Sequence, residues 1–148
     1  MVYQFREGAR MHGDPQKVGE EIDSIRAKHG GSVLPVQIVA KAKSPSSILH
    51  GYFEWDDTEA SRKFREDQAR ALLRSIVVCS ESEDFPPTRA FVVVVEEEAS
   101  YHHITDVVEN DEHLEQVLNR AKRAVKAWRL RYKNLQHFSE LFRLIDAI

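Results

Sequence analysis

The stretch SIVVCSESEDFPPTRAFVVVVEEE, residues 75–98, decides the fold class, because helical spacing of apolar residues changes here to two continuous apolar runs. The runs at 76–79 and 90–95 are rich in valine, a residue that favours strands. The segment ESEDFPPTR between them contains two adjacent prolines, which are typical of a loop. The stretch therefore predicts two antiparallel strands near residues 75–97, joined by a proline-containing loop.

The chain before this stretch is predicted to be mainly helical over residues 14–74. Asp14 and Pro15 are typical of a helix start, and Gly30 and Gly31 are typical of its end. Apolar residues recur between them at helical spacing. Ahead of this helix, YQF at residues 3–5 alternates apolar and polar side chains, which predicts a short strand.

A second, short helix is predicted at PVQIVAKA, residues 35–42, after the five-residue turn GGSVL. Two helices joined by a short turn also suggest a DNA-binding helix-turn-helix. A recognition helix needs an exposed face of polar side chains, and only Gln37, Lys41 and Lys43 are available here. The alternative is a helical hairpin that packs on the core.

The next helix is predicted to begin at the acids of EWDDTEASRKFREDQARALL, residues 54–73. Asp56 with Glu59 forms a capping box, and Asp57 suits the positive first turn. A divalent metal would need several oxygen ligands that converge, and neighbouring acids point to different sides. The predicted apolar face is Ala60, Phe64, Leu72 and Ile76, and the side chains left to water are Arg62, Lys63, Arg65, Arg70 and Arg74.

The C-terminal third is predicted to be one long helix or a helix pair over residues 110–148. Asn110 is a candidate cap, and no glycine or proline follows it. Apolar residues recur in alternating steps of four and three, which is a heptad seam of the kind that joins helices. Its members are Leu114, Leu118, Ala121, Val125, Trp128, Tyr132 and Leu135. The pattern continues through Phe138, Phe142 and Ile145, with a slip near Ser139 that is able to bend or break the helix.

The length and composition of the chain indicate that these elements form one domain. The 148 residues are 42% hydrophobic, which suffices for a single core over residues 1–148. We expect an α+β fold, mainly helical, with a small antiparallel sheet and a long C-terminal helix. Only Cys79 is present, so no intrachain disulfide forms, and no segment has the pattern of a leader or membrane span. A cytoplasmic location is expected.

Charge is strongly segregated although the net charge is only −3. Residues 81–115 contain eleven acids against one base, Arg89, and residues 120–133, RAKRAVKAWRLRYK, contain seven bases and no acid. The seven bases are Arg120, Lys122, Arg123, Lys126, Arg129, Arg131 and Lys133. They favour a phosphate-binding surface. An acidic protein surface, on this chain or on a partner, and a merely solvated face are the alternatives.

No catalytic or metal-binding motif stands out, and no cofactor is expected. His102 and His103 in YHHITD, residues 101–106, are the best metal candidates, but adjacent residues of a strand face opposite sides. Cys79 is followed by acidic residues, which do not favour a reactive thiolate, so it is expected to be a small apolar residue of the sheet. We therefore predict that the protein is not an enzyme.

Two segments resemble a group of small phage and prophage proteins: LPVQIVAKAKSPSSILHGYFEWDDTEASRKFREDQARALLRSIVV, residues 34–78, and AWRLRYKNLQHFSELFRLIDAI, residues 127–148. The group shares a Pro-x-x-Val-Val helix, a Ser-Pro-Leu-His segment before Phe-Glu-Trp-Asp-Asp, a Gln-Ala-Arg helix and an Arg-x-x-Tyr-x-x-Leu tail. This sequence departs at Ile38, within the valine pair, and at Ile48, where the group has proline. The resemblance implies a phage or prophage origin and carries no activity or site residues.

Two functions are predicted. The first is a non-enzymatic phage-type accessory protein that binds DNA or RNA through the seven bases of the C-terminal helix. The second is a protein-interaction module, such as a virion assembly protein or an inhibitor of a host protein. In this alternative the seam drives self-association or binds another protein, and the residues that carry it are Leu118, Val125, Trp128, Tyr132 and Leu135.

Overall fold

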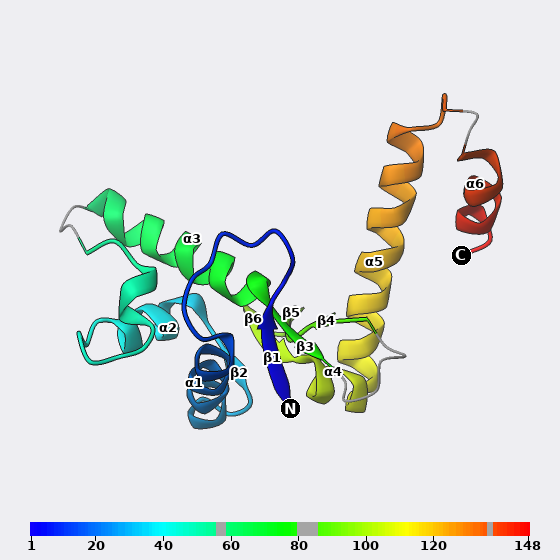
Figure 1. Ribbon diagram of the computed structural model, residues 1–148. Coiled ribbons are helices and arrows are strands. Elements are labelled where there is room, and N and C mark those ends of the chain that lie inside the picture. Colours follow the sequence, from blue (N-terminus) through cyan, green and yellow to red (C-terminus); the bar gives the residue numbers. More distant parts are fainter. Residues whose placement is uncertain (56–58, 80–85, 136–137) are drawn as a thin grey trace. The chain divides into compact units, whose positions relative to one another are not determined.

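The computed structural model describes residues 1–55, 59–79, 86–135 and 138–148, and it has the predicted α+β class (Figure 1). The described residues form six α-helices and two small antiparallel sheets. They divide into two compact units, Met1–Val107 and Val108–Ile148. We call them the N-terminal unit and the C-terminal unit, and the single domain expected over residues 1–148 stays a prediction. Among the described residues, no helix combines the length and the apolar character that crossing a bilayer requires.

The elements follow one another as the sequence patterns predict, with additions. The helices are α1 (Pro15–Lys28), α2 (Pro35–Ala42), the 3₁₀ turn η1 (His50–Tyr52), α3 (Glu59–Ser75), α4 (Ile104–Glu109), α5 (Asp111–Arg131) and α6 (Ser139–Asp146). The strands are β1 (Val2–Phe5), β2 (Ser32–Val33), β3 (Ile76–Cys79), β4 (Thr88–Arg89), β5 (Phe91–Val95) and β6 (Ala99–His103).

The pairing of the strands corrects the prediction made from residues 75–98. One sheet has the order β1-β3-β4 and the other β2-β6-β5, so β3 pairs with β1 and β4, and not with β5. β5 pairs with β6, which was not predicted. Only three residues separate β5 from β6, so this hairpin closes easily, and the strand that pairs with β3 across the proline-containing loop is the short β4. Cys79 ends β3 as a half-buried free thiol, as expected for a residue of the sheet.

Ala90 links the two sheets. Its backbone N–H donates to the carbonyl oxygen of Ile76 at 3.1 Å, and its carbonyl oxygen accepts from the N–H of Ile104 at 2.8 Å. Because Ala90 is fully buried, both bonds are shielded from water. The segment that contains β4 and β5 therefore leaves one sheet and enters the other at this residue.

Helix α1 forms as its sequence predicts. The Asp14 side chain accepts hydrogen bonds from the backbone N–H groups of Gln16 and Lys17, which is the geometry of an N-cap. At the other end Gly30 and Gly31 adopt φ values of 73° and 95°, a region that other residues rarely enter. The prediction of this helix is confirmed.

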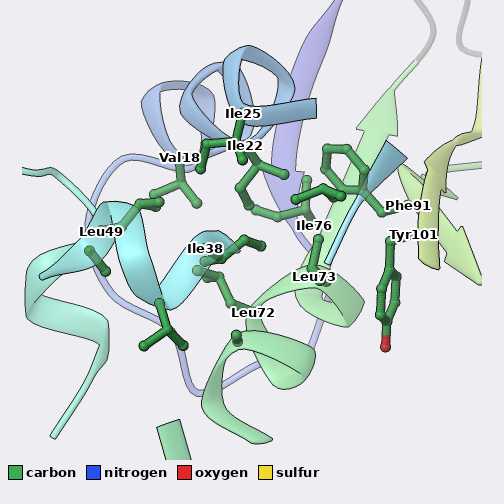
Figure 2. Close-up of a cluster of buried hydrophobic side chains, with 14 of the residues drawn as sticks. Val18, Ile22, Ile25, Ile38, Leu49, Leu72, Leu73, Ile76, Phe91 and Tyr101 are labelled. Carbon is green, nitrogen blue, oxygen red and sulfur yellow. The ribbon is translucent and has the colours of Figure 1, made fainter. Parts of the chain in front are cut away.

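The core of the N-terminal unit lies between α1, α2, α3 and the strands (Figure 2). Its largest fully buried side chains include Ile22 from α1, Ile38 from α2 and Phe91 from β5. α2 buries Ile38, Val39 and Ala42, and the chain between α1 and α2 pairs with β6 as β2. Burial of α2 matches the helical hairpin that packs on the core, the alternative to a DNA-binding helix-turn-helix.

The predicted apolar face of α3 is partly wrong. Phe64 is 52% exposed, whereas Arg65 is only 9% exposed and its guanidinium lies 5.4 Å from the ring centre of Trp55. The buried face follows Arg65, Ala69, Leu72 and Leu73. A cation–π contact and a bond to the carbonyl oxygen of Glu54 make burial of the arginine favourable. The predicted caps Asp56 and Asp57 lie outside the described residues.

Helix α1 passes very close to β1 at Gly19. A Cβ atom at Gly19 would lie 2.2 Å from Cγ of Tyr3. Gly19→Ala is expected to lower the free energy of unfolding by about 1–2 kcal/mol, the cost of overpacking reduced by the gain in helix propensity. Urea denaturation measures it, and Gly51→Ala, where a Cβ meets nothing within 4 Å, is the control. An unchanged stability of Gly19→Ala would contradict the close packing.

Candidate nucleic-acid interface

Helix α5 carries acids at its start and bases at its end. The Asn110 side chain accepts a hydrogen bond from the backbone N–H of His113 at 3.1 Å and caps the first turn, as predicted. The first-turn acids are Asp111 and Glu112, and the last-turn bases are Arg129 and Arg131. Both placements are stabilised by the helix dipole. The helix therefore passes from acidic to basic along its length.

The chain turns back after α5. Tyr132 ends the helix by donating its backbone N–H to the carbonyl oxygen of Trp128 at 3.1 Å. Two further bonds, from the N–H of Leu135 to the oxygen of Tyr132 and from that of Phe138 to the oxygen of Leu135, form the turn. α6 then runs back beside α5 (Figure 1). Of the two forms predicted for residues 110–148, the structure has the helix pair, and the break precedes Ser139.

Aromatic rings hold the two helices of the C-terminal unit together. The ring centre of Trp128 lies 5.5 Å from that of Phe138 and 6.1 Å from that of Phe142. Phe142 is 8% exposed, and it also lies 5.4 Å below the guanidinium of Arg129. Nη2 of Arg129 lies 2.5 Å from Oδ2 of Asp146. One charged pair and one aromatic cluster therefore fix α6 against the second half of α5.

The seven predicted nucleic-acid-binding residues all lie on α5 or in the turn after it. Six are exposed: Arg120, Lys122, Arg123, Lys126, Arg131 and Lys133. Arg129 differs, because its guanidinium contacts Asp146 and Phe142 within the unit. At about 100° per residue, Lys122 and Lys126 lie about 40° apart on one side of α5, beside the apolar seam, and Lys133 lies in the turn after the helix. Arg120, Arg123 and Arg131 lie further round the helix.

The predicted seam residues divide into two groups. Trp128 and Tyr132 join the aromatic cluster, their ring centres 5.2 Å apart. Leu118 and Leu135 stay exposed, at 50% and 43%, and Val125 is half-buried. Among the described residues of α5, none is buried. Within this unit Trp128 therefore packs against α6, while Leu118 and Leu135 leave apolar surface open.

Between α5 and α6 lies an apolar groove of about 600 Å³. Ala124, Val125 and Trp128 line one side, and Leu141, Leu144 and Ile148 line the other. Leu144 is 68% exposed. The sequence pattern identified Phe142 and Ile145 as part of the seam but not the second apolar side of α6. The apolar residues Leu141 and Leu144 indicate this second side, because they are three positions apart, which places them on one face of a helix, and they fall outside the seam.

The histidine pair lies in the N-terminal unit and forms no metal site with other described residues. Nδ1 of His103 lies 2.8 Å from Oγ1 of Thr105, and its Nε2 lies 3.5 Å from the hydroxyl of Tyr3. His102 lies instead beside Ser100, with Nε2 and Oγ 2.9 Å apart. Within the described ranges, no three His, Cys, Asp or Glu side chains gather as metal ligands. The arrangement is a buried hydrogen-bonded network.

Two pKa values in this network are shifted by burial. Burial raises the pKa of the Tyr3 hydroxyl to about 12, with a smaller effect in the same direction from Asp23. Burial and the positive charge of Arg26 lower the pKa of His103 below its ordinary value of 6.5. Both groups therefore stay neutral near pH 7. Arg26 itself is held by ion pairs with Asp23 and Asp106.

The lowered pKa of His103 predicts loss of stability in acid. A depressed histidine pKa means that the unfolded chain takes up the proton more readily than the folded protein. The contribution of neutral His103 to the free energy of unfolding is therefore complete above pH 6.5 and is lost as the pH falls below it. Urea unfolding between pH 7.5 and 5.0 should show a steeper loss for the natural protein than for His103→Gln. His12→Gln, at an exposed site, should keep the natural slope. Equal slopes in all three proteins would contradict the assignment.

No family model, curated protein or solved structure matches this chain. What the fold and the charged helix define is therefore a small α+β protein with a helical hairpin at its C-terminal end. The phage or prophage origin, the cytoplasmic location and the absence of an activity stay predictions.

Proposed function

We propose that the protein is a non-enzymatic nucleic-acid-binding protein that contacts phosphates through α5. The observation that carries the proposal is the exposure of six bases over residues 120–133 with no acid among them. Exposed positive charge of this density attracts polyanions and releases their counterions. Small phage proteins without catalytic motifs are often DNA-associated accessory factors, virion parts or inhibitors of a host protein, and the resemblance supports the proposal only through this association.

The spacing of the bases suits a phosphate backbone. The exposed bases on α5 extend from Arg120 to Arg131, about 16 Å of helix axis at 1.5 Å per residue, and Lys133 follows in the turn after the helix. Duplex DNA carries about one charge per 1.7 Å of its axis, so these bases are able to meet several phosphates at once. Lysine side chains are long and flexible point charges, which tolerate small differences in phosphate position. The expected mode is therefore binding with little sequence preference.

Base stacking is not expected to contribute. Trp128 is the largest aromatic side chain of the unit, but its ring packs against Tyr132, Phe138 and Phe142. Proteins that prefer single strands commonly place aromatic rings where bases can stack on them. We therefore expect no strong preference for single strands over duplexes.

Fluorescence anisotropy with labelled single- and double-stranded DNA and RNA tests the proposal over a series of salt concentrations. Six phosphate contacts, one for each exposed base, would give a slope of about −5 for the logarithm of the binding constant against the logarithm of salt on duplex DNA. Absence of binding at low salt would overturn the proposal and leave the basic face to an acidic protein. Binding that does not respond to salt would overturn the phosphate mode.

A further inference from the structure

The C-terminal unit leaves more apolar surface open than a small isolated unit normally does. It spans Val108–Ile148, and among its described residues only Phe142 and Ile145 are buried. Leu118, Leu144 and Ile148 are each at least half exposed. A hairpin of this size buries too little surface on its own for a stable core. Exposed apolar surface of this kind is typical of a protein interface.

We propose that a second copy of this chain covers this surface, with the two α5 helices antiparallel. The distribution of charge along α5 indicates that the partner is a second copy. Residues 111–118 contain the acids Asp111, Glu112 and Glu115 and no lysine or arginine, while residues 119–131 contain six bases and no acid. In an antiparallel pair the acidic half of each helix lies beside the basic half of the other. In a parallel pair, six bases would lie beside six bases.

The residues beside the seam support the same orientation. Glu115, Lys122 and Arg129 lie one position after seam residues Leu114, Ala121 and Trp128, and so recur every seven residues on one flank. In an antiparallel pair this flank faces the same flank of the other helix, whereas in a parallel pair it faces the opposite flank. The opposite flank carries Val117, Ala124 and Arg131. Only the antiparallel pair therefore brings an acid of this flank beside a base.

A register follows from these pairs. Arg129 is already bound to Asp146 in its own chain, so Lys122 is the base left on this flank to face Glu115 of the second copy. This pairing places the two-fold axis near residue 119 and sets Leu118 beside Ala121 of the second copy. A large residue then meets a small one across the axis, which favours close packing. The self-association surface adds to the nucleic-acid proposal and does not depend on it, because it rests on the apolar seam and on the pairing of Glu115; the two surfaces share Lys122.

Two kinds of variant test the interface itself. Sedimentation equilibrium should give a dimer for the natural protein, and Leu144→Ser should weaken it by at least about tenfold, since it removes apolar surface that each copy buries against the other. Leu144 is 68% exposed in the single chain, so its replacement leaves the fold intact. A monomer at every concentration, or a complex that forms only with a different protein, would overturn the second copy as occupant.

Charge reversal tests the orientation. Asp111→Lys/Glu112→Lys/Glu115→Lys should weaken the dimer at least about tenfold, since like charges then face each other, and added Lys122→Glu/Lys126→Glu should restore it. Glu7→Lys/Glu97→Lys/Glu98→Lys makes the same change in net charge at exposed positions of the N-terminal unit and should leave the dimer unchanged. Equal weakening by both triple variants would overturn the charge argument.

Distances between spin labels give the orientation directly, in a Cys79→Ser background. Glu112→Cys and Ala127→Cys lie at equal distances on either side of the proposed axis, at exposed positions. In mixed antiparallel dimers the distance from label 112 to label 127 is shorter than that between two labels at 112. In a parallel dimer the two labels at 112 are the closer pair. Labels 112 and 127 are then separated by about 22 Å along the helix axis. The reversed order would overturn the antiparallel arrangement while leaving self-association in place.

Discussion

Replacing Lys122, Lys126 and Lys133 with glutamate is expected to weaken binding to duplex DNA by on the order of 100-fold or more at low salt, because each lost phosphate contact removes the free energy of counterion release. The same variant should flatten the salt dependence, with the slope smaller in size by about 2–3. Since all three side chains are exposed, the fold should not change. Fluorescence anisotropy at several salt concentrations measures both effects.

Lys122 also faces Glu115 of the second copy in the proposed dimer, so sedimentation equilibrium of the same variant separates loss of phosphate contacts from loss of self-association. Arg129 is left in place because it holds Asp146 and covers the ring of Phe142, so its replacement would also loosen the hairpin. Lys43→Glu/Lys63→Glu/Arg74→Glu, with the same change of net charge at exposed positions of the N-terminal unit, is the matched control. If the control loses as much affinity as the α5 variant, only net charge matters and α5 is not the contact surface.

Replacing Phe142 with alanine is expected to release α6 from α5. The ring is 8% exposed and contacts Trp128, Phe138 and the guanidinium of Arg129, and loss of a buried phenylalanine costs about 3–5 kcal/mol. The two-helix unit has few other buried contacts to offset this loss. Hydrogen exchange should show amides of α6 exchanging close to the rate of an unfolded peptide, while those of α1 and α3 keep their protection.

Arg143→Ala is the control for this effect, because Arg143 is exposed on the same helix. Its α6 amides should keep the protection of the natural protein. Protection of α6 that survives Phe142→Ala would contradict the aromatic cluster as the contact that holds the hairpin.

Local signals in the sequence predicted most elements, and pairing over distance was harder to predict. The cap Asp14 and the two glycines after α1 are short-range features, and the structure confirms them. The partner of β3 is β1, more than seventy residues away, and no turn residue indicates this pairing. β6 was missed because Ser100, Tyr101, His102 and His103 are polar or partly polar, although all four are buried. Hydrogen bonds between Ser100 and His102 and from His103 to Thr105 and Tyr3 make burial of the polar groups possible, and the contact with Tyr3 depends on a segment far away in the sequence.

The candidate site was predictable in composition but not in geometry. Seven bases without an acid are visible in the sequence, and so is the apolar seam beside them. The contact between Arg129 and Asp146 is not, because it depends on the chain reversing direction after Tyr132. On α3, Arg65 is buried instead of the predicted Phe64. This too depends on contact between distant parts of the chain, because Trp55, from a different segment, contacts the arginine.

The two bonds of Ala90 have a mechanical consequence. Tension applied to the first strand is carried through β3 to the segment around Ala90, and from there through β5 to β6 and β2. Force applied to one sheet is therefore transmitted to the other through the buried Ala90, which joins them. A pull at the β1 edge reaches the β2 edge without passing through a loop, so the sheet portion of the N-terminal unit transmits strain as a single body.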